Sequence, residues 1–233
     1  MAEPEDIVER VETMFSTGPL SGKKVMITAG PTRESIDPVR YISNHSTGKM
    51  GIELAREAAL QGASVTLILG PVENQPELPA RIIPVVTAEE MYNAAVNTAG
   101  ESDILIFSAA VADFSPENPS TQKIKKSGSS QVINLKSTAD ILADLGKKKK
   151  PGQFIAGFAL ETQNAIEEGK RKLMAKNCDL MVVNSLADEG AGFGFETNKV
   201  TLLGRDGSET ALPLLSKSDT AKEIFRQIIS SCK

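Results

Sequence analysis

A stretch near the start of the chain, RYISNHSTGKMG at residues 40–51, combines hydrogen-bond donors with two glycines and a lysine. It lies between an apolar segment typical of a buried strand and a segment with helical periodicity. The first turn of a helix offers N–H groups without intrahelical partners, together with the positive end of the helix dipole. Ser46, Thr47 and Gly48 can bring donors to one point, and Lys49 adds a positive charge. The pattern favours a phosphate-binding site over an ordinary N-cap, which needs one serine or threonine.

Lysines elsewhere in the chain could offset the charge of an anionic ligand. Lys123 and two neighbouring lysines lie in a polar segment, and Lys172 and Lys176 are four residues apart in a predicted helix. Helical lysines usually lie on the solvated surface, so the second pair alone is a weak indication. A nucleoside triphosphate nevertheless requires several cations, because its charge must be offset as pyrophosphate leaves. Asp113 ends an apolar segment, where it suits either a polar contact with a ligand or a turn cap.

Strand-like and helix-like segments alternate from Lys23 onward. The apolar runs that predict strands are 23–30, 64–72, 102–114, 154–162 and 179–185, and the third of these strands runs into a turn of small residues. The segments that predict helices are 51–61, 87–100, 164–177 and 216–232, and Thr87 and Glu90 can form a capping box in the second. Residues 198–213 predict a C-terminal β-hairpin that turns at Asp206-Gly207. The order predicts a Rossmann-like α/β three-layer sandwich with a mainly parallel sheet.

Two long segments interrupt the alternation. Residues 114–138 are polar and contain only a short strand-like piece, QVINLK, whereas residues 186–198 are rich in glycine and predict a mobile loop. Loops of this length in a compact domain are usually functional or disordered. The unusual segments follow predicted strands, at the carboxyl end where a doubly wound sheet places its site. We therefore expect a cleft at that edge of the sheet.

Composition excludes several classes of protein. The net charge of −4 argues against a general nucleic-acid binder, which favours a basic surface. No apolar run approaches the roughly 20 residues that span a bilayer, and the acidic start lacks the apolar core of a signal peptide. Two cysteines make no disulfide framework, and a single histidine argues against a histidine-based metal site. We expect a cytoplasmic protein without nucleic-acid or membrane partners.

Common nucleotide-binding motifs fit poorly. A Walker loop needs Ser or Thr after its lysine, but Met50 follows Lys49. A dinucleotide fingerprint needs glycines directly between strand and helix, whereas some twenty residues separate Gly30 from the predicted helix. An NAD(P)-dependent reductase is therefore a weaker alternative, and a non-catalytic nucleotide-binding module leaves the polar clusters unexplained.

Several motifs together resemble those of phosphopantothenate–cysteine ligase, also called phosphopantothenoylcysteine synthetase, of the bacterial type. They are AGPTRE, RYISNHSTGKMG, SAAVADF, KIKK, GFALET and the Lys-x-x-x-Lys helix, in the family's order. The resemblance covers nearly the whole chain from Lys23 and implies one synthetase domain, residues 23–233, with a flap loop. Residues 1–22 resemble the linker that joins this domain to a flavin-dependent decarboxylase in the bifunctional coenzyme A biosynthesis protein.

The resemblance implies a reaction. The family joins 4′-phosphopantothenate to L-cysteine, using CTP with Mg²⁺ in the bacterial type. The carboxylate is first activated as an acyl-cytidylate with release of pyrophosphate, and the amine of cysteine then displaces CMP. The family works as a homodimer, with parts of the partner chain completing the pantothenate site. The dimer element is expected around residues 114–138 or in the C-terminal hairpin, whose edges would otherwise stay unpaired.

The resemblance also assigns residues. Asn44 is expected to act on the acyl-nucleotide through its amide donor, and Lys123, on a flap over the site, in forming that intermediate. The residues expected to bind phosphopantothenate are Arg40, Asn44, Ser46, Thr47, Gly48, Lys49 and Ala110. Those expected to bind the nucleotide are Gly30, Phe107, Ser108, Ala109, Asp113, Lys123, Ala139, Asp140, Ile141, Leu142, Phe158, Lys172 and Lys176. His45 receives no catalytic role.

Overall fold

A computed structural model of the 233-residue chain describes residues 18–126, 128, 131–161, 163–185 and 194–232. The described strands are β1 (Lys24–Ala29), β2 (Arg33–Ser35), β3 (Tyr41–Ser43), β4 (Ser64–Leu69), β5 (Arg81–Pro84), β6 (Ile104–Phe107), β7 (Phe114–Pro116), β8 (Leu135–Ser137), β9 (Phe154–Glu161), β10 (Leu180–Ser185), β11 (Thr197–Asn198), β12 (Val200–Gly204), β13 (Glu209–Ala211) and β14 (Leu215–Ser216). The described helices are α2 (Lys49–Leu60), α3 (Ala88–Ala99), α4 (Ile141–Lys147), α5 (Ala165–Ala175) and α6 (Lys217–Ser231).

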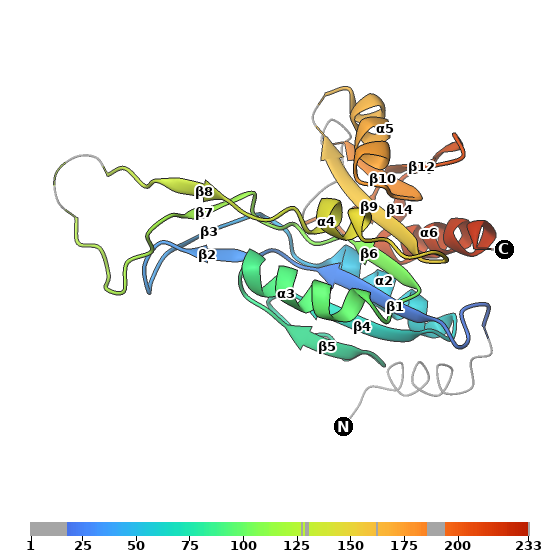
Figure 1. Ribbon diagram of the computed structural model, residues 1–233, viewed down its shortest axis with the longest axis horizontal. Coiled ribbons are helices and arrows are strands. Elements are labelled where there is room, and N and C mark those ends of the chain that lie inside the picture. Colours follow the sequence, from blue (N-terminus) through green and yellow to red (C-terminus); the bar gives the residue numbers. More distant parts are fainter. Residues whose placement is uncertain (1–17, 127, 129–130, 162, 186–193, 233) are drawn as a thin grey trace.

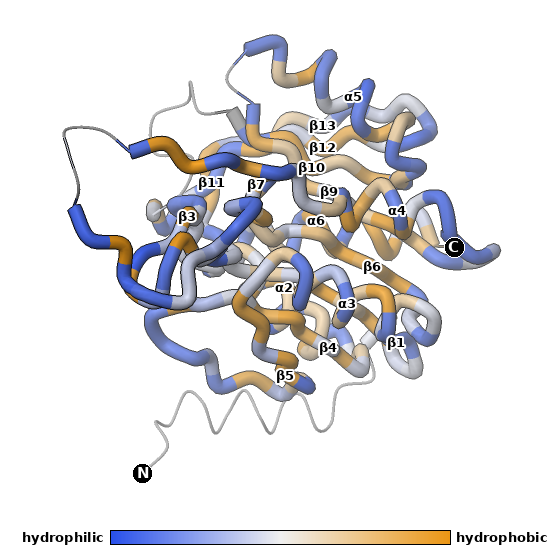
Figure 2. Tube along the Cα trace, turned by 60° about the vertical axis from the view of Figure 1, so that its left-hand side comes forward, coloured by the Kyte–Doolittle hydropathy of each residue, from blue (hydrophilic) through white to orange (hydrophobic). Residues whose placement is uncertain are grey.

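The centre of the molecule is a mainly parallel eight-stranded sheet in the order β13-β12-β10-β9-β6-β1-β4-β5 (Figure 1). The strands from β10 to β5 in this order run parallel to their neighbours, and the hairpin of β12 and β13 adds antiparallel to β10. Buried parallel strands need apolar side chains on both faces, and the central strands are accordingly the most apolar part of the chain (Figure 2). The predicted Rossmann-like fold is confirmed.

Helices cover both faces of this sheet and make it the middle of three layers. Helices α2 and α6 bury Leu54 and Phe225 against one face, and α3, α4 and α5 bury Met91, Leu145 and Leu173 against the other. The predicted capping box of α3 is present: the Thr87 hydroxyl accepts from the Glu90 amide at 3.1 Å. None of the described helices is long and apolar enough to cross a membrane.

An arm of two short antiparallel ribbons projects from the sheet (Figure 1). Strand β2 pairs with β3, and β7 pairs with β8. The arm contains strands that were not predicted, because residues 41–43 form β3 and Phe114 begins β7. The third predicted strand ends at Phe107 and runs into a turn of small residues, as expected. Residues 1–17 of the expected linker and 186–193 of the expected mobile loop lie outside the described residues.

Candidate functional site

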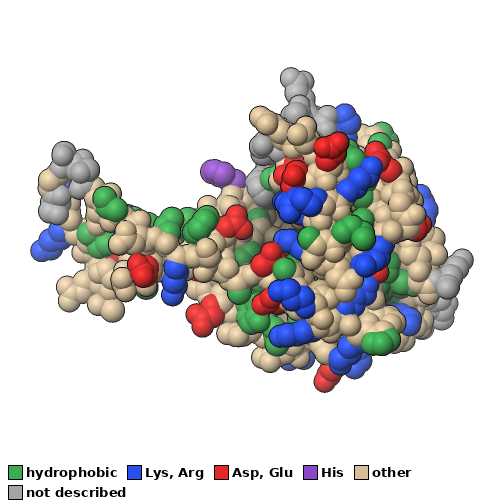
Figure 3. Space-filling view, turned by 45° about the horizontal axis from the view of Figure 1, so that its top comes forward, with side chains coloured by type: hydrophobic (Ala, Val, Ile, Leu, Met, Phe, Trp, Pro, Cys, Tyr) green, Lys and Arg blue, Asp and Glu red, His purple; other side chains and the backbone are tan. Residues whose placement is uncertain are grey.

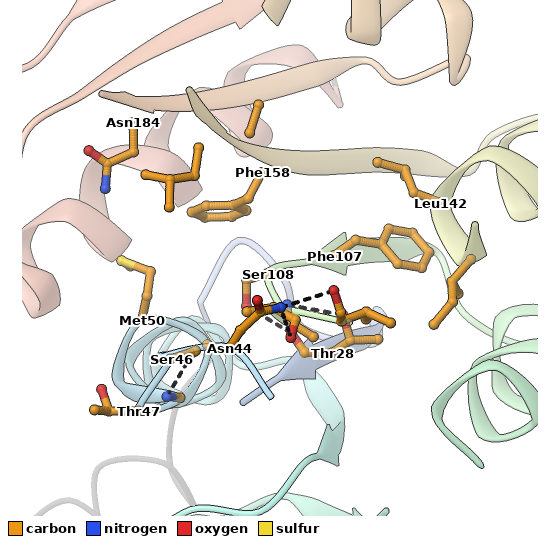
Figure 4. A pocket seen from close by; sticks show the side chains of 18 of the residues that line it. Thr28, Asn44, Ser46, Thr47, Met50, Phe107, Ser108, Leu142, Phe158 and Asn184 are labelled. Atoms are coloured by element: carbon orange, nitrogen blue, oxygen red, sulfur yellow. Dashed lines mark hydrogen bonds between the residues drawn. The ribbon is translucent and has the colours of Figure 1, made fainter. Parts of the chain in front are cut away.

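A cavity of about 470 Å³ opens at the carboxyl ends of β1, β6 and β9 and beside the start of α2. This is the edge at which a doubly wound sheet holds ligands, and the volume suits a small-molecule site. Figure 4 shows Phe107 and Leu142 on one side, Met50 and Asn184 on the other, and Phe158 and Asn44 between them. The residues that line it include Thr28, Asn44, Ser46, Thr47, Gly48, Lys49, Met50, Gly51, Phe107, Ser108, Ala109, Ala110, Val111, Asp113, Thr138, Ala139, Asp140, Ile141, Leu142, Phe158, Lys176, Asn184, Asn198 and Lys217.

Helix α2 begins at the cavity with its first turn uncapped by a side chain. Its N-cap is Gly48, not Ser46 or Thr47, with φ of 78° in the left-handed region. Helix α2 starts at Lys49, two residues before the predicted start. Because no side chain caps the helix, the N–H groups of its first turn remain available to an anion in the cavity.

Gly51 allows α2 to lie directly against the end of β1. A Cβ atom at this position would come within 2.4 Å of the Ala29 Cβ and 2.6 Å of the Ser108 Oγ. The Ser108 hydroxyl is itself held by the Thr28 carbonyl, to which it donates at 2.7 Å. The helix start, β1 and the turn after β6 therefore form one closely packed wall.

The Asn44 side chain is fixed by two carbonyl groups of the turn after β6. Its Nδ2 donates to the carbonyl oxygens of Ala110 and Val111 at 2.9 and 3.1 Å (Figure 4). Carbonyl oxygens only accept, so they determine which way the amide is turned. Both N–H donors are thereby used within the protein, and Oδ1 is the atom left for a ligand. The donor role of Asn44 towards a substrate carbonyl therefore stays a prediction, and in this arrangement the free side-chain atom is an acceptor.

Small residues and two phenylalanines form the part of the cavity expected to hold a nucleotide. The Ser108 and Ala109 amides are tied to Thr28 at the end of β1 at 3.2 and 3.4 Å, which leaves a shallow wall of Ser108, Ala109 and Ala110. Helix α4 begins on the same side, with Asp140 as its N-cap accepting from the Ala143 amide at 3.0 Å.

Three lysines reach the cavity, each with an oxygen partner. Lys49 forms an ion pair with Glu196, and Lys217, at the start of α6, donates to the Phe195 carbonyl at 2.5 Å. Burial lowers the pKa of Lys217, although Glu196 opposes this. Lys176 pairs with Asp140 at 3.0 Å on the opposite side.

The Lys176–Asp140 pair brings a carboxylate and a cation together beside α4. Burial alone would raise the pKa of Asp140, but the Ala143 amide and Lys176 outweigh it and lower that pKa. Asp140 is therefore charged at neutral pH, and an anionic ligand that takes Lys176 must separate this pair.

Four of the expected site residues do not line the cavity. Lys172 pairs with Glu161 at 2.6 Å, whereas Lys176 pairs with Asp140 at 3.0 Å. The two lysines therefore have separate partners. Gly30 lies behind Gly48, against the cavity wall. Arg40 and Lys123 lie on the arm, where Arg40 is bonded to Asp37 and to the Ile124 carbonyl. Arg40 and residues 46–49 were expected to bind the same substrate, but within one chain Arg40 does not line the cavity that residues 46–49 line.

The other expected residues do meet in the cavity. They are Asn44, Ser46, Thr47, Gly48, Lys49, Phe107, Ser108, Ala109, Ala110, Asp113, Ala139, Asp140, Ile141, Leu142, Phe158 and Lys176. His45 is exposed where the arm meets the body (Figure 3).

Sequence reasoning missed one wall of the cavity. Asn184 donates to the Asn198 Oδ1 at 3.3 Å, Asn198 contacts the Met50 sulfur at 3.3 Å, and Lys217 lies beside them. Asn184 is the last residue but one of the predicted strand 179–185, and its position near the carboxyl end was a usable signal. Asn198 and Lys217 had none, because only the antiparallel return of the chain after β10 brings them to this edge.

Residues 20–232 match the protein family described as the DNA/pantothenate metabolism flavoprotein C-terminal domain. The chain belongs to this family. Among curated proteins, this chain is 48% identical over 237 residues to the coenzyme A biosynthesis bifunctional protein CoaBC of Bacillus subtilis (strain 168). It is 49% identical over 236 residues to a cysteine/cysteine sulfinic acid decarboxylase of an unknown prokaryotic organism. The matches span 100% and 99% of the chain but only 58% and 66% of those two proteins, respectively.

A solved structure supports the same assignment of the domain. The crystal structure of the C-terminal domain of the coenzyme A biosynthesis bifunctional protein CoaBC is 39% identical, with a TM-score of 0.79. The match covers 92% of this chain and 98% of that one. The resemblance to the C-terminal domain of the bifunctional protein, expected from the motifs, is confirmed.

Proposed function

We propose that this domain is a phosphopantothenate–cysteine ligase that joins 4′-phosphopantothenate to L-cysteine in coenzyme A biosynthesis, with CTP as the activating nucleotide. The observation that carries the proposal is the cavity itself. It joins an uncapped helix start, a wall of small residues and the fixed Asn44 amide at the carboxyl edge of the sheet. The likeness to CoaBC proteins over nearly the whole chain supports it.

The reaction requires two exchanges at one carbonyl group. A carboxylate oxygen of phosphopantothenate attacks the α-phosphorus of CTP, and the bond to the bridging oxygen breaks to release pyrophosphate. The nitrogen of cysteine then attacks the carbonyl carbon, the bond to the CMP oxygen breaks, and the new amide nitrogen loses a proton. Asn44 Oδ1 can accept a hydrogen bond from that nitrogen as it attacks, because both Asn44 donors are held by Ala110 and Val111.

The cavity has a lysine on each of two sides, Lys49 and Lys176, and we assign one phosphate-bearing substrate to each side. We assign the phosphate of phosphopantothenate to the start of α2, with Ser46, Thr47 and Lys49. We assign the nucleotide to the wall of Phe107 to Ala110 and to the start of α4, with Phe158 against it and Lys176 near its phosphates.

Mg²⁺ fits the residues on the nucleotide side. This ion keeps several waters and binds through one or two carboxylates plus substrate phosphates. Asp113 lines the cavity and is exposed, and none of the described residues forms an ion pair or side-chain hydrogen bond with its carboxylate. No cluster of three or more His, Cys, Asp or Glu side chains exists among the described residues, so Asp113 would hold the ion together with the triphosphate. Such an ion would neutralise charge on the leaving pyrophosphate.

A second copy of the chain supplies what one cavity lacks. The arm carries exposed apolar side chains along its length (Figure 3), namely Val39, Tyr41, Phe114, Val132, Ile133 and Leu135. Val132 is 86% exposed in a single chain. Contiguous exposed apolar surface marks interaction sites, and the same arm holds Arg40 and Lys123 away from their own cavity. We therefore propose a homodimer in which each arm brings these two cations to the cavity of the other chain.

The test is product analysis with 4′-phosphopantothenate, cysteine and Mg²⁺, with CTP and ATP supplied in parallel. We expect the amide, CMP and pyrophosphate, formed faster with CTP than with ATP. ADP and phosphate would instead indicate an acyl-phosphate ligase and overturn the roles of Asn44 and Lys123. No turnover with either nucleotide would favour a binding module. Cysteine alone, assayed for release of CO₂, tests the decarboxylase activity that the name of one relative carries.

The relatives of this chain are longer than the chain itself, which suggests a further domain in the same protein. Because the chain matches 58% of the B. subtilis protein, we propose that the natural protein also contains a flavin-dependent decarboxylase domain joined through residues 1–22. We further propose a cytoplasmic location, where the three substrates would be available.

A further inference from the structure

One buried carboxylate joins two segments of the arm that are far apart in sequence, the β2–β3 turn and residues 120–126, which together are called the arm tip. Asp37 lies in the turn between β2 and β3 and is 3% exposed. Its Oδ1 accepts from the amides of Val39 and Arg40, both at 2.9 Å. Its Oδ2 accepts from the Arg40 guanidinium at 2.6 and 3.2 Å and from the Ile124 amide at 3.1 Å. An ordinary Asx turn uses a side-chain oxygen only locally, so the second oxygen needs another explanation.

The second oxygen fixes the backbone next to Lys123. The Ile124 amide donates to Asp37, and the Ile124 carbonyl accepts from Arg40 Nη2 at 3.1 Å, so both polar backbone groups of this residue are held. Three residues before Lys123, the Ser120 amide donates to the Ile36 carbonyl at 2.9 Å. Lys123 therefore lies between two anchored points, and its exposed side chain has no ion pair or hydrogen bond with the described residues.

The same contacts leave one edge of Arg40 available. The carboxylate takes Nε and Nη2, whereas Nη1 has no hydrogen bond to any residue that the structure describes. The Arg40 guanidinium lowers the pKa of Asp37 far below its usual range, although burial opposes this. The carboxylate thus stays charged at any pH at which an enzyme would work, so Oδ2 remains a strong acceptor for both guanidinium N–H groups.

We infer that Asp37 is a positioning residue that holds Arg40 and Lys123 together at the arm tip, so that both cations reach the phosphates of the substrates as one unit. The inference rests on the proposed function, which gives these two residues their task. It adds the reason why Arg40 and Lys123 lie close together, which is that Asp37 binds both Arg40 and the backbone next to Lys123. Misplacing a reacting or neutralising group by about 1 Å can cost on the order of a hundredfold in rate. A rigid arm tip should therefore increase the reaction rate.

Asp37→Asn separates the two jobs of the carboxylate. Asparagine retains one oxygen, which can still accept from the Val39 and Arg40 amides and keep the turn. Its NH₂ group then faces the Ile124 amide and the Arg40 guanidinium, which are donors, so the link to residues 120–126 is lost. Asp206→Asn is the matched control, because Asp206 also accepts from a nearby backbone amide, that of Ser208 at 2.9 Å, in an exposed turn of another hairpin.

The experiment measures the arm tip and the chemistry separately in the full chain. Hydrogen exchange of the Ile124 amide and tryptic cleavage after Lys123 are expected to quicken by roughly ten- to a hundredfold in Asp37→Asn, the loss of a charge-assisted hydrogen bond. Pyrophosphate release is expected to slow by a similar factor through kcat, with little change in KM for cysteine. Asp206→Asn should leave all three readouts unchanged, and Asp37→Glu should restore part of the release rate.

Unchanged exchange and cleavage in Asp37→Asn would overturn the inference. So would faster exchange with unchanged pyrophosphate release, provided that Lys123→Gln abolishes release. If Lys123→Gln also releases pyrophosphate at the normal rate, the role proposed for Lys123 is wrong. The inference that Asp37 positions Lys123 for catalysis is then wrong as well.

Discussion

Gly51→Ala tests whether the close contact between α2 and β1 builds the cavity. The added Cβ would lie 2.4 Å from the Ala29 Cβ and 2.6 Å from the Ser108 Oγ. Carbon atoms in contact are normally about 3.5–4.0 Å apart, so α2 must retreat by about 1 Å. Overpacking costs about 1–3 kcal/mol, and contact with two atoms at under 3.0 Å places this change in the upper part of that range, at about 2–3 kcal/mol. The higher helix propensity of alanine returns about 1 kcal/mol. We expect a net loss of about 1–2 kcal/mol in the free energy of unfolding.

Thermal unfolding and turnover report the two consequences of that shift. For a domain of this size, the loss corresponds to a melting temperature lower by about 2–8 °C. Moving the start of α2 by about 1 Å should also reduce turnover by on the order of a hundredfold. Gly100→Ala is the matched control, because Gly100, the C-cap of α3, also has helical backbone angles (φ −62°, ψ −23°) and its Cβ would meet only the Lys150 Nζ at 3.6 Å. That variant should gain about 0.4–1 kcal/mol.

Two results would refute the reasoning. An unchanged or higher melting temperature for Gly51→Ala would mean that the wall between α2 and β1 is not closely packed. Full turnover in a destabilised Gly51→Ala protein would mean that the start of α2 does not belong to the site.

Three further predictions concern Asn44, the arm and the cysteines. Asn44→Asp places a carboxylate against the Ala110 and Val111 carbonyls, so we expect pyrophosphate release to continue while amide formation falls at least about tenfold; equal loss of both would contradict the role of Asn44. Val132→Glu should convert a dimer to monomers in analytical ultracentrifugation and reduce turnover, whereas an unchanged dimer would remove the arm from the interface. Burial raises the pKa of the Cys178 thiol to about 12, so at pH 8 only Cys232 should react readily with a thiol reagent until urea unfolds the protein, and two fast thiols would refute this.

The central sheet was predictable because its signals are local. Continuous apolar runs identify β1, β4, β9 and β10, and the turn at Asp206-Gly207 lies between β12 and β13 as predicted, with Gly207 at φ of 88°. The position of the cavity followed from the fold, since parallel strands present their carboxyl ends at one edge. These inferences need only the pattern within each segment and the order of segments.

The arm was not predictable for the opposite reason. Strands β2, β3, β7 and β8 have three residues each, too few for an alternating pattern to be recognised. They exist because residues far apart pair, as Phe114 does with Ser137. The orientation of Asn44 was hidden in the same way, because it depends on carbonyl groups 66 and 67 residues further along the chain. Strand β5 escaped notice because it is a four-residue edge strand ending in Pro84.

The cavity wall draws on residues from Thr28 to Lys217, almost the whole described chain. The site therefore cannot exist in any partly synthesised or locally opened form of the domain that lacks either end of this span. A ligand bound there is in equilibrium with the completely folded state, and its binding free energy adds to the stability of the whole domain in proportion to RT ln(1 + [L]/Kd). Protection of amides in β1 and in α6 should then rise together as ligand is added, because loss of either element releases the ligand.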